Sequence, residues 1–408
     1  MLEELELAFE EQERDRGRHR HRRGSARGRK PKAAKRRGRS FLALLMTLVL
    51  LGALGAGGWY GFDKVKDFFT APDYGSAAGT SEVHVKVSTG QTATDIGQTL
   101  VRAGVIKSVA AYTDAAKANP HGNEVQPGTY KLRKQMRASA ALDALLLIDA
   151  KGNLANKISN KVTIPEGTIA VDVFSQLSKA TNIPVAEFEA AAKDPVALGV
   201  QDWWFKRSDG KDAAKTVEGF LFPATYEFDP GVDAKTILST MVNKFNTVMG
   251  DLRFADKVQA DRHISPYEAL IVASIAQAEA PLPEDMSKVA RVLYNRAFGG
   301  TFPCSCLQVD VTVNYWLRAQ GKDAQQSKNL TQSQLHNANN PYNTHDKPGL
   351  PVGPIDNPGK DAIQGAMAPA EGPWVFFVTI DKQGHTAFAT TNAEHDHNIE
   401  QAKKNGVL

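Results

Sequence analysis

The stretch "SPYEALIVASIAQAEAPLP" occupies residues 265–283, and Glu279 is the only charged residue between its first turn and its end. Pro281 disfavours helical backbone for the residue before it. A good N-cap, a proline suited to the first helical turn and a glutamate that completes a capping box mark the start. These three residues are Ser265, Pro266 and Glu268. The stretch therefore predicts a helix over about residues 266–280, with Glu279 in its last turn.

The position of Glu279 is unfavourable for a charged carboxylate. At 100° per residue its side chain falls between Val272 and Ile275 on an apolar helix face. Apolar neighbours and the negative end of the helix dipole both disfavour the charged form, so both raise the pKa. A carboxylic acid that stays protonated near neutral pH suits general acid catalysis. An ion pair with Arg291 or Arg296 of the following helix is the structural alternative.

The chain has 408 residues. A single hydrophobic core rarely organises a chain of this length, so more than one domain is expected. Its net charge is only +4, yet residues 14–39 contain fourteen Lys or Arg and one acid. This composition predicts a disordered tail over residues 1–40. A basic tail also suits nucleic acid, but no aromatic platform accompanies it, so no nucleic-acid partner is expected. Attraction to anionic lipid headgroups explains the same residues.

Residues 41–62 contain no charged residue. As a helix they extend roughly 33 Å, enough to cross the hydrocarbon layer of a bilayer. A cleavable signal peptide is the alternative, but this apolar run and the segment before it are both too long for one. Because the basic excess lies on the N-terminal side, we expect a single-pass cell-membrane protein with a cytoplasmic N-terminus and residues 63–408 outside.

The remaining patterns predict a stalk or linker at 63–81 and an α+β fold beyond it. Alternating valines in 82–90 predict a strand, and a helix and a second strand follow within a small α/β module at 82–160. Residues 161–408 mix strands and helices in a second, larger domain.

Three further segments of this larger domain carry local signals. "VTIPEGT" at 162–168 predicts a strand and then a helix, and "WVFFVTIDKQGHTAFATT" at 374–391 predicts a hairpin that turns between Asp381 and Gly384. Residues 340–359 are rich in Pro, Gly and Asn, which predicts a long ordered surface loop of a kind that is commonly functional.

The cysteines and histidines do not predict a metal site. Cys304 and Cys306 are separated by one residue and are either free thiols or a local disulfide, since the outer compartment is oxidising. A zinc site needs two further ligands at suitable spacing, and none stands nearby. His395 and His397 lie about 200° apart on a helix, so they do not chelate one ion together. A structural hydrogen bond is the expected role of His395.

Several motifs together resemble the MltG/YceG-like family of membrane-anchored endolytic murein transglycosylases. They span about residues 82–400 and occur in the family's order: "QPGTY", "TIPEGT", "EGFLFPATY", "ASIAQAEA", "KVARVLYNR", "LQVDVTV", "PYNTH", "GLPVGPI" and "GHTAFATTNAEH". Family members often carry two glutamates two residues apart in the helix quoted first. Gln277 replaces the first of them here, which leaves Glu279 as the only counterpart of the catalytic acid.

The resemblance implies a reaction that needs one carboxylate. The C6 hydroxyl of MurNAc attacks its own C1 and releases GlcNAc, so Glu279 acts first as general acid and then as base, and no cofactor is required. The resemblance also implies a LysM-like module at 82–160 that contacts glycan. The implied partners are peptidoglycan strands, the cytoplasmic membrane, and synthases of the elongation or division machinery.

Other polar residues are expected to position the glycan and stabilise the transition state. The candidates are Gln308, Asp310, Thr312, Tyr342, Asn343 and Thr344. The first three alternate along a segment expected to be extended, so they share one face. The last three belong to the long loop and offer a ring for stacking and groups for hydrogen bonds. A cap role for Asp310 and a turn role for Asn343 are the structural alternatives.

Two other classes of protein fit part of the pattern. A noncatalytic membrane-anchored peptidoglycan-binding scaffold would use Glu279 only to pair with an arginine. A membrane-tethered metal-dependent hydrolase would use the histidines, and a chelator would abolish its activity.

Overall fold

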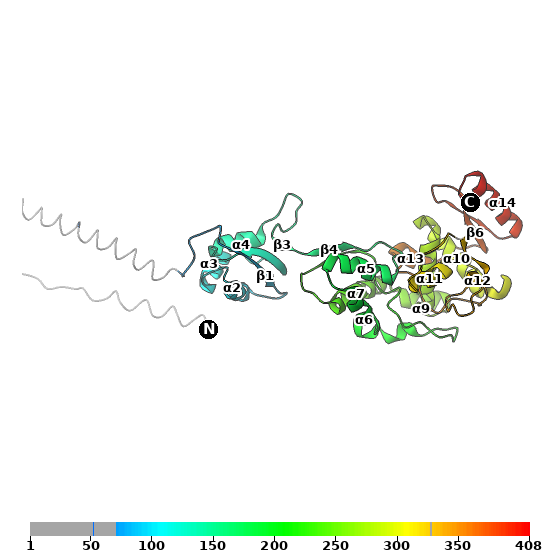
Figure 1. The fold of residues 1–408 in the computed structure, drawn as a ribbon, viewed down its shortest axis with the longest axis horizontal. Helices are drawn as coiled ribbons and strands as arrows, with labels where there is room; N and C mark the ends of the chain where they lie inside the picture. Colours follow the sequence, from blue (N-terminus) through cyan, green and yellow to red (C-terminus); the bar gives the residue numbers. More distant parts are fainter. Residues whose placement is uncertain (1–51, 53–70, 327–328) are drawn as a thin grey trace, which may run out of the picture. The chain divides into compact units, whose positions relative to one another are not determined.

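The computed structural model describes Gly52, residues 71–326 and residues 329–408. The elements below lie in one compact unit, Pro72–Leu408, labelled in Figure 1. Helices and small antiparallel sheets make this unit α+β, which confirms the expected fold class. Apart from Gly52, the expected membrane helix at 41–62 lies outside the described residues. Among the residues described, none of the helices combines the length and apolar character needed to cross a membrane.

The first sheet has the antiparallel order β1-β2-β3. The valines of β1 alternate as expected, with Val85 and Val87 buried. They pack in a core with Leu100 and Tyr130, which are both fully buried. The elements of this region are β1 (Glu82–Val87), α2 (Ala93–Arg102), α3 (Val109–Ala118), β2 (Gly128–Arg133), α4 (Ala138–Leu146) and β3 (Lys157–Ile158).

The next region opens with a strand and then a helix, as "VTIPEGT" predicts. Its two strands, β4 and β5, pair antiparallel. The helices that follow are amphipathic, and their apolar sides join one large core with the rest of the chain to residue 367. The elements are β4 (Asn160–Thr163), α5 (Ala170–Thr181), α6 (Val185–Ala192), η1 (Val196–Leu198), η2 (Asp202–Phe205), β5 (Thr225–Phe228), α7 (Ala234–Leu252) and α8 (Phe254–Arg262).

Helix α9 (Pro266–Glu279) occupies the middle of this core, and its start and end confirm the sequence prediction. Ser265 and Glu268 form the expected capping box. Every residue from Pro266 to Ala276 is buried, because α9 packs against α10 (Pro283–Phe298), α13 (Lys360–Met367) and α8. Only its C-terminal turn, which carries Glu279, reaches partial exposure.

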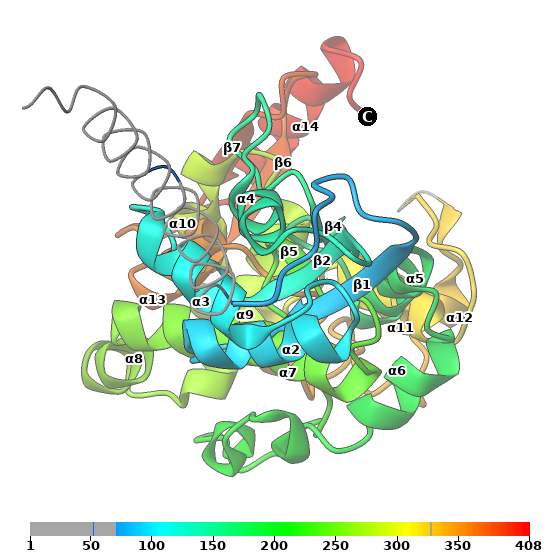
Figure 2. The same cartoon turned by 90° about the vertical axis from the view of Figure 1, so that its left-hand side faces the viewer.

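The C-terminal region contains the predicted hairpin. Strands β6 and β7 pair antiparallel, and α14 packs on both of them (Figure 2). The elements are η3 (Pro303–Ser305), α11 (Val311–Ala319), α12 (Gln332–Leu335), β6 (Phe376–Thr379), β7 (Thr386–Ala389) and α14 (Asn392–Lys404).

The long loop at 340–359 is ordered, but the expectation that it lies on the surface is wrong. Most of it is buried, including Leu350, Ile355 and Asn357. Buried backbone needs hydrogen-bond partners, and α9 supplies two of them. Ser274 Oγ accepts from the Ile355 amide at 3.0 Å, and Gln277 Oε1 accepts from the Gly359 amide at 2.9 Å. Polar side chains of α9 therefore accept hydrogen bonds from the backbone of a loop whose composition alone predicts exposure to water.

This pairing predicts the effect of Ser274→Ala. The substitution leaves the buried Ile355 amide without its acceptor, so the free energy of unfolding should fall by about 1–3 kcal/mol. Chemical denaturation measures it, with Ser239→Ala in α7, a partly exposed residue, as the matched control. Equal stabilities of the two variants would show that the loop does not depend on this bond.

Candidate active site

Glu279 lies at the C-terminal end of α9, beside α10 and the segment before α11. Its side chain is set deep among protein atoms but is not fully enclosed. Burial raises the pKa of its carboxyl to about 7, and the negative charge of Asp310 acts in the same direction. The positive charge of Arg296 opposes both and is the weakest of the three influences. The upward shift predicted from the sequence therefore agrees with the geometry.

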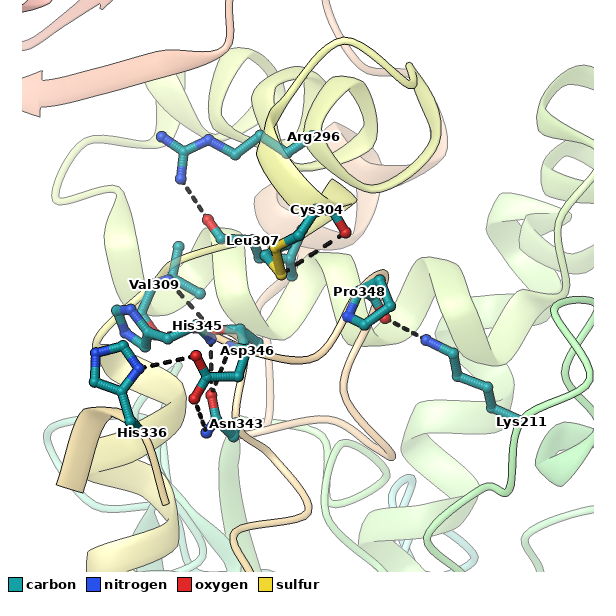
Figure 3. The surroundings of a disulfide bond; sticks show 12 residues. Lys211, Arg296, Cys304, Leu307, Val309, His336, Asn343, His345, Asp346 and Pro348 are labelled. Atoms are coloured by element: carbon teal, nitrogen blue, oxygen red, sulfur yellow. Dashed lines mark hydrogen bonds and ion pairs between the residues drawn. A yellow bond between two sulfur atoms is a disulfide. The ribbon is translucent and has the colours of Figure 1, made fainter. Parts of the chain in front are cut away.

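Arg296 approaches Glu279 from α10, but its guanidinium is held mainly by other groups. Its Nε donates to the carbonyl of Val375 at 2.6 Å, and its Nη1 donates to the carbonyl of Leu307 (Figure 3). The guanidinium also stacks over the ring of Phe302, with its central carbon 4.4 Å from the ring centroid. These contacts hold α10 against the segments that contain Phe302, Leu307 and Val375. Its nearness to Glu279 adds a fixed positive charge to the site.

The alternative partner, Arg291, is engaged elsewhere. Its Nε donates to the carbonyl of Ala370 at 2.6 Å. The influences on the pKa of Glu279 include no contribution from Arg291. The structure therefore does not support a role for Glu279 as the ion-pair partner of Arg291.

Asp310 stands next to Glu279 and contacts a histidine from the long loop. His345 Nε2 lies 3.1 Å from Asp310 Oδ1; the His345 side chain is largely buried, and the Asp310 side chain is partly exposed. Asp310 takes the N-cap position of α11 without a side-chain cap bond, so its carboxylate is directed to other groups. Sequence reasoning did not select His345. Its position in "PYNTH", within the family motif, was the available signal.

The segment around Asp310 is not extended, so the expectation that Gln308, Asp310 and Thr312 share one strand face is wrong. Gln308 has a left-handed backbone with φ of 53°, Asp310 is helical, and Thr312 lies inside α11. The alternating pattern "QVDVTV" instead spans a turn and the first residues of a helix. Gln308 is exposed and Asp310 partly exposed, whereas Thr312 is fully buried.

Thr312 and Thr344 join this segment to the long loop. Their hydroxyl oxygens lie 3.0 Å apart, and both hydroxyls donate to the carbonyl of Val309, at 2.8 and 3.2 Å. The Gln308 amide donates to the carbonyl of Thr344 at 2.8 Å. Because both threonines are completely buried, they fix the backbone that presents Gln308 and Asp310.

Tyr342 and Asn343 are also buried. The ring of Tyr342 packs edge-on against Tyr315, with centroids 4.7 Å apart. The side-chain oxygen of Asn343 accepts from the His345 amide at 2.8 Å, which is the turn role considered from the sequence. Both residues therefore shape the loop from inside it and place His345.

Cys304 and Cys306 form a disulfide, with Cα atoms 5.1 Å apart. Of the two states left open by the sequence, the structure shows the oxidised one. The disulfide loop lies against the long loop, because the Gly349 amide donates to the carbonyl of Ser305 at 2.8 Å. It directly precedes Leu307, whose carbonyl holds Arg296.

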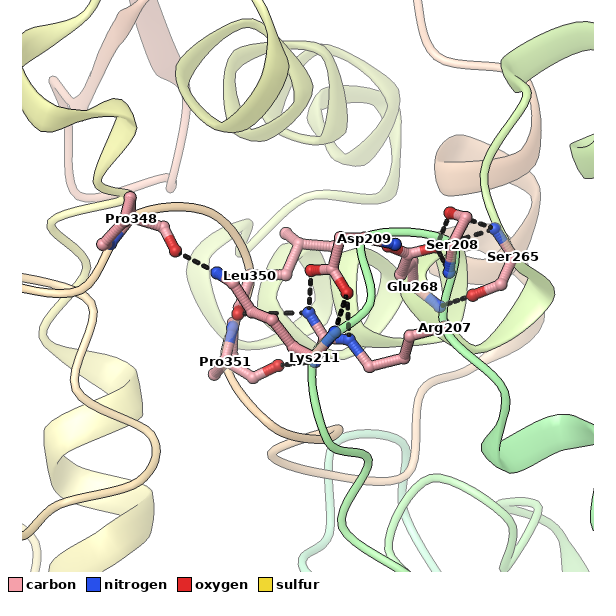
Figure 4. A network of polar contacts seen from close by, with 9 residues as sticks. All are labelled: Arg207, Ser208, Asp209, Lys211, Ser265, Glu268, Pro348, Leu350 and Pro351. Atoms are coloured by element: carbon pink, nitrogen blue, oxygen red, sulfur yellow. Dashed lines mark hydrogen bonds and ion pairs between the residues drawn. The ribbon is translucent and has the colours of Figure 1, made fainter.

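The opposite end of α9 is anchored by Glu268. Its carboxylate accepts from the amides of Ser265, Ser208 and Asp209 at 2.7, 3.1 and 3.1 Å (Figure 4). Despite burial, hydrogen bonds from Ser208 and Ser265 keep its pKa below the ordinary value. Two carboxylates on one helix therefore have opposite environments, and only Glu279 lacks such support.

Two more acids at the long loop are buried: Asp356 belongs to the loop, and Glu218 contacts it. Glu218 accepts from the Ala170 amide and from Asn357 Nδ2, both at 3.0 Å, and burial raises its pKa to about 8. Burial and the nearby Glu218 raise the pKa of Asp356 well above its ordinary range. These bonds tie α5 to the loop, so Glu218 has a structural role.

The histidines at the C-terminus do not gather. His395 stacks on Phe376, with ring centroids 4.9 Å apart, and burial lowers its pKa. This stacking takes the place of the expected hydrogen bond. Within residues 71–326 and 329–408 no three His, Cys, Asp or Glu side chains come together as a metal site would require.

Glu279, Asp310, Arg296 and His345 therefore form the polar centre of the site. A carboxyl with a pKa near 7 can give a proton and take one back at neutral pH. Asp310 supplies a nearby negative charge that suits a cationic, oxocarbenium-like transition state. The arrangement can perform general acid–base chemistry.

Comparison with known proteins gives consistent matches. The sequence model of the YceG-like family matches residues 85–401. The endolytic murein transglycosylase of Streptococcus pneumoniae serotype 2 (strain D39) is 27% identical over 371 residues, which cover 86% of this chain and 63% of that protein. The endolytic murein transglycosylase of Bacillus subtilis (strain 168) is 27% identical over 320 residues, 77% of this chain and 83% of that protein. The chain thus spans less than two thirds of the pneumococcal relative.

One solved structure is similar as well. A crystal structure of a putative yceG-like protein from Listeria monocytogenes aligns with a TM-score of 0.49 and 24% identity. The alignment covers 78% of this chain and 98% of that one.

The raised pKa of Glu279 predicts a pH-dependent stability. Because the folded state binds this proton more tightly than the unfolded state, stability falls as the pH rises from the ordinary glutamate value, about 4.5, to about 7. Glu279→Gln has no proton to lose in this range. The free energy of unfolding of the variant, minus that of the unchanged protein, should therefore increase as the pH rises from about 4.5 to about 7. Denaturant titrations at pH 4 and pH 8 measure the change. A constant difference between the two proteins would contradict the assigned pKa.

Proposed function

This chain belongs to the YceG-like family, and we propose that it is an endolytic lytic transglycosylase of peptidoglycan. It cleaves the MurNAc–GlcNAc bond inside nascent strands and leaves 1,6-anhydro-MurNAc ends. The observation that carries the proposal is the carboxyl of Glu279, whose pKa burial and Asp310 raise to about 7. The names of the pneumococcal and Bacillus subtilis relatives support the same activity.

Glu279 serves as acid and then as base in this reaction. Its protonated carboxyl donates to the glycosidic oxygen while the bond from C1 of MurNAc to that oxygen breaks, and GlcNAc leaves. The C6 hydroxyl oxygen then bonds to C1, and its proton passes to the Glu279 carboxylate, which restores the starting state. Atoms and charge balance without water, metal or cofactor, and each step needs a group that titrates near the working pH.

The neighbours of Glu279 adjust its two roles. Asp310 favours the protonated form before the reaction and stabilises positive charge that develops at C1. Arg296 stabilises the carboxylate after the proton has been donated. Because Arg296 is held by the carbonyls of Val375 and Leu307, it stays near Glu279 without forming a close ion pair that would keep the acid deprotonated.

The six polar candidates divide by exposure. Gln308 and Asp310 retain exposed surface, so they are the ones that we assign to direct contact with the glycan. The other four are buried and act by holding the two loops in register: Thr312, Tyr342, Asn343 and Thr344.

Asp310 also favours a second candidate reaction, hydrolysis. Most glycoside hydrolases use two carboxyl groups, and the second activates water or attacks the sugar. Asp310 is the carboxylate whose charge reaches Glu279, so a hydrolase would use it as that second group. The two reactions differ in product, since hydrolysis leaves a reducing end and transglycosylation leaves an anhydro end.

The central test uses uncrosslinked glycan strands and Glu279→Gln. The unchanged protein should release shorter strands with 1,6-anhydro-MurNAc ends, detected by mass spectrometry. Glu279→Gln keeps the size of the side chain but removes its transferable proton, so the rate should fall by at least about 10²–10⁴-fold. Glu284→Gln, an exposed glutamate at the start of α10, is the matched control and should retain activity.

Each other result has a definite meaning. Undiminished anhydro product from Glu279→Gln would eliminate the assignment and favour a noncatalytic peptidoglycan-binding scaffold. Reducing ends that disappear in Asp310→Asn would establish the hydrolase.

The placement of the protein is part of the proposal. The basic residues before the uncharged stretch 41–62 support a membrane anchor with residues 1–40 in the cytoplasm and 63–408 outside. The region 82–160 acts as a LysM-like module that holds glycan, and synthases of the elongation or division machinery are the partners. The family resemblance supports both of these assignments.

A protease test checks this topology. Protease added to cells whose wall has been opened should digest residues 63–408 and spare a tag fused before residue 1, because the membrane shields the cytoplasmic side. A C-terminal tag is the matched control and should be lost. A protected C-terminal tag would refute the orientation.

A further inference from the structure

A cavity lies between residues 201 and 256, and its lining does not include Glu279. It has a volume of about 260 Å³ and opens between η2, the end of α7 and the start of α8. Its aromatic wall consists of Trp203 and Trp204, whose rings stack with centroids 4.8 Å apart. Trp204 is 2% exposed, whereas Trp203 is 39% exposed, so one indole presents a face to solvent.

The exposed indole stands on a rigid base. The ring of Trp204 contacts Phe220, Phe245 and Phe254, with centroids 5.6, 5.2 and 6.1 Å apart. All three phenylalanines are buried in the main core. Because Trp204 is packed among these rings, its stacking with Trp203 restricts the exposed indole, so less conformational entropy is lost when a ligand binds.

Polar groups surround this aromatic wall. Asn246 Nδ2 donates to the carbonyl of Gly199 at 3.0 Å, which fixes the amide and leaves its oxygen available as an acceptor. Arg253 and Asp256 lie at the junction of α7 and α8, with Arg253 Nε 3.6 Å from Asp256 Oδ2. Both are exposed, and Gln201 completes the lining on the other side.

This combination of groups fits a sugar ring. A pyranose has apolar C–H faces that pack on an indole, and hydroxyl groups at its edge that pair with amides, carboxylates and guanidinium groups. Small-molecule sites are lined mainly by apolar and aromatic groups with a few convergent polar ones. We propose that this cavity binds a saccharide unit of the glycan strand at a second position, remote from the bond that is cut.

The position of the cavity gives this binding a role in the reaction. Phe205 of η2 packs on Tyr267 at the start of α9, with ring centroids 5.8 Å apart. Tyr267 and Glu279 are twelve residues apart, about 18 Å along the helix axis. A strand held at both ends of α9 is cut away from its terminus, so the cavity favours internal cleavage. This inference rests on the proposed function, since it takes the bound polymer to be the substrate.

Direct binding tests the proposal without turnover. The full chain carrying Glu279→Gln is titrated with uncrosslinked glycan strands and, separately, with chitohexaose, and Kd is measured by calorimetry. Adding Trp203→Ala should raise Kd for the strands about tenfold, the ratio that corresponds to one lost aromatic contact. Phe298→Ala, which truncates an exposed aromatic residue of α10 outside the cavity, is the matched control and should leave Kd unchanged.

A second measurement covers the case in which Trp203→Ala does not fold. In the Glu279→Gln chain labelled with 5-fluorotryptophan, the fluorine resonance assigned to Trp203 should shift when chitohexaose is added. An unchanged resonance, an equal Kd for Trp203→Ala and its control, or no binding of either glycan would overturn the proposal. Failure of the proposed function looks different: Glu279→Gln would still cut strands, while the effect of Trp203→Ala on their binding remained.

Discussion

The burial of α9 is the constraint on which the rest of the structure depends. A helix that is buried from Pro266 to Ala276 leaves its few polar side chains with little or no water, so they must find partners in the protein. Ser274 and Gln277 meet this need by binding the amides of Ile355 and Gly359. Glu268 meets it by accepting three amide hydrogen bonds. The helix thereby organises two loops while remaining in the core.

Glu279 is the exception on this helix, and its chemistry follows from that exception. A carboxylate in the last turn faces the negative end of the helix dipole as well as low-dielectric surroundings. Asp310 strengthens the effect, and Arg296 limits it. Both neighbours are held by contacts that do not involve Glu279, so the field at the carboxyl is set before any substrate arrives. Preorganised charge of this kind is a major source of enzymatic rate enhancement.

Local signals predicted local structure well, and tertiary contacts account for the rest. Ser265, Pro266 and Glu268 fixed the start of α9 because caps act within one helical turn. The hairpin of β6 and β7 was predicted for the same reason. The burial of residues 340–359 could not be predicted, because it depends on acceptors contributed by a helix about eighty residues earlier in the chain.

In the candidate site, too, local features could be predicted from the sequence and tertiary contacts could not. Glu279 was identifiable because it breaks a local rule, but its two charged neighbours come from other elements. The alternation of polar and apolar residues at 308–312 led to the wrong prediction of an extended segment, since the same alternation also fits a turn followed by a helix. Thr312 and Thr344 were selected as glycan contacts, but both are buried, and their hydroxyls lie within hydrogen-bonding distance of each other and of the carbonyl of Val309. Spacing alone does not show this pairing between two segments.

The backbone before α11 shows how strongly the fold fixes this part of the site. Cys304, Ser305 and Gln308 all have left-handed backbones, with φ of 52°, 52° and 53°. Residues with side chains adopt this conformation at a cost of about 1–3 kcal/mol each, and only where their surroundings determine it. Here the surroundings hold the backbone in this conformation. The disulfide and the amide of Gly349 fix residues 304–306, and the two buried threonines, Thr312 and Thr344, fix the segment that follows. The result is a short, irregular segment that holds the carbonyl of Leu307 against Arg296 and sets Asp310 beside Glu279.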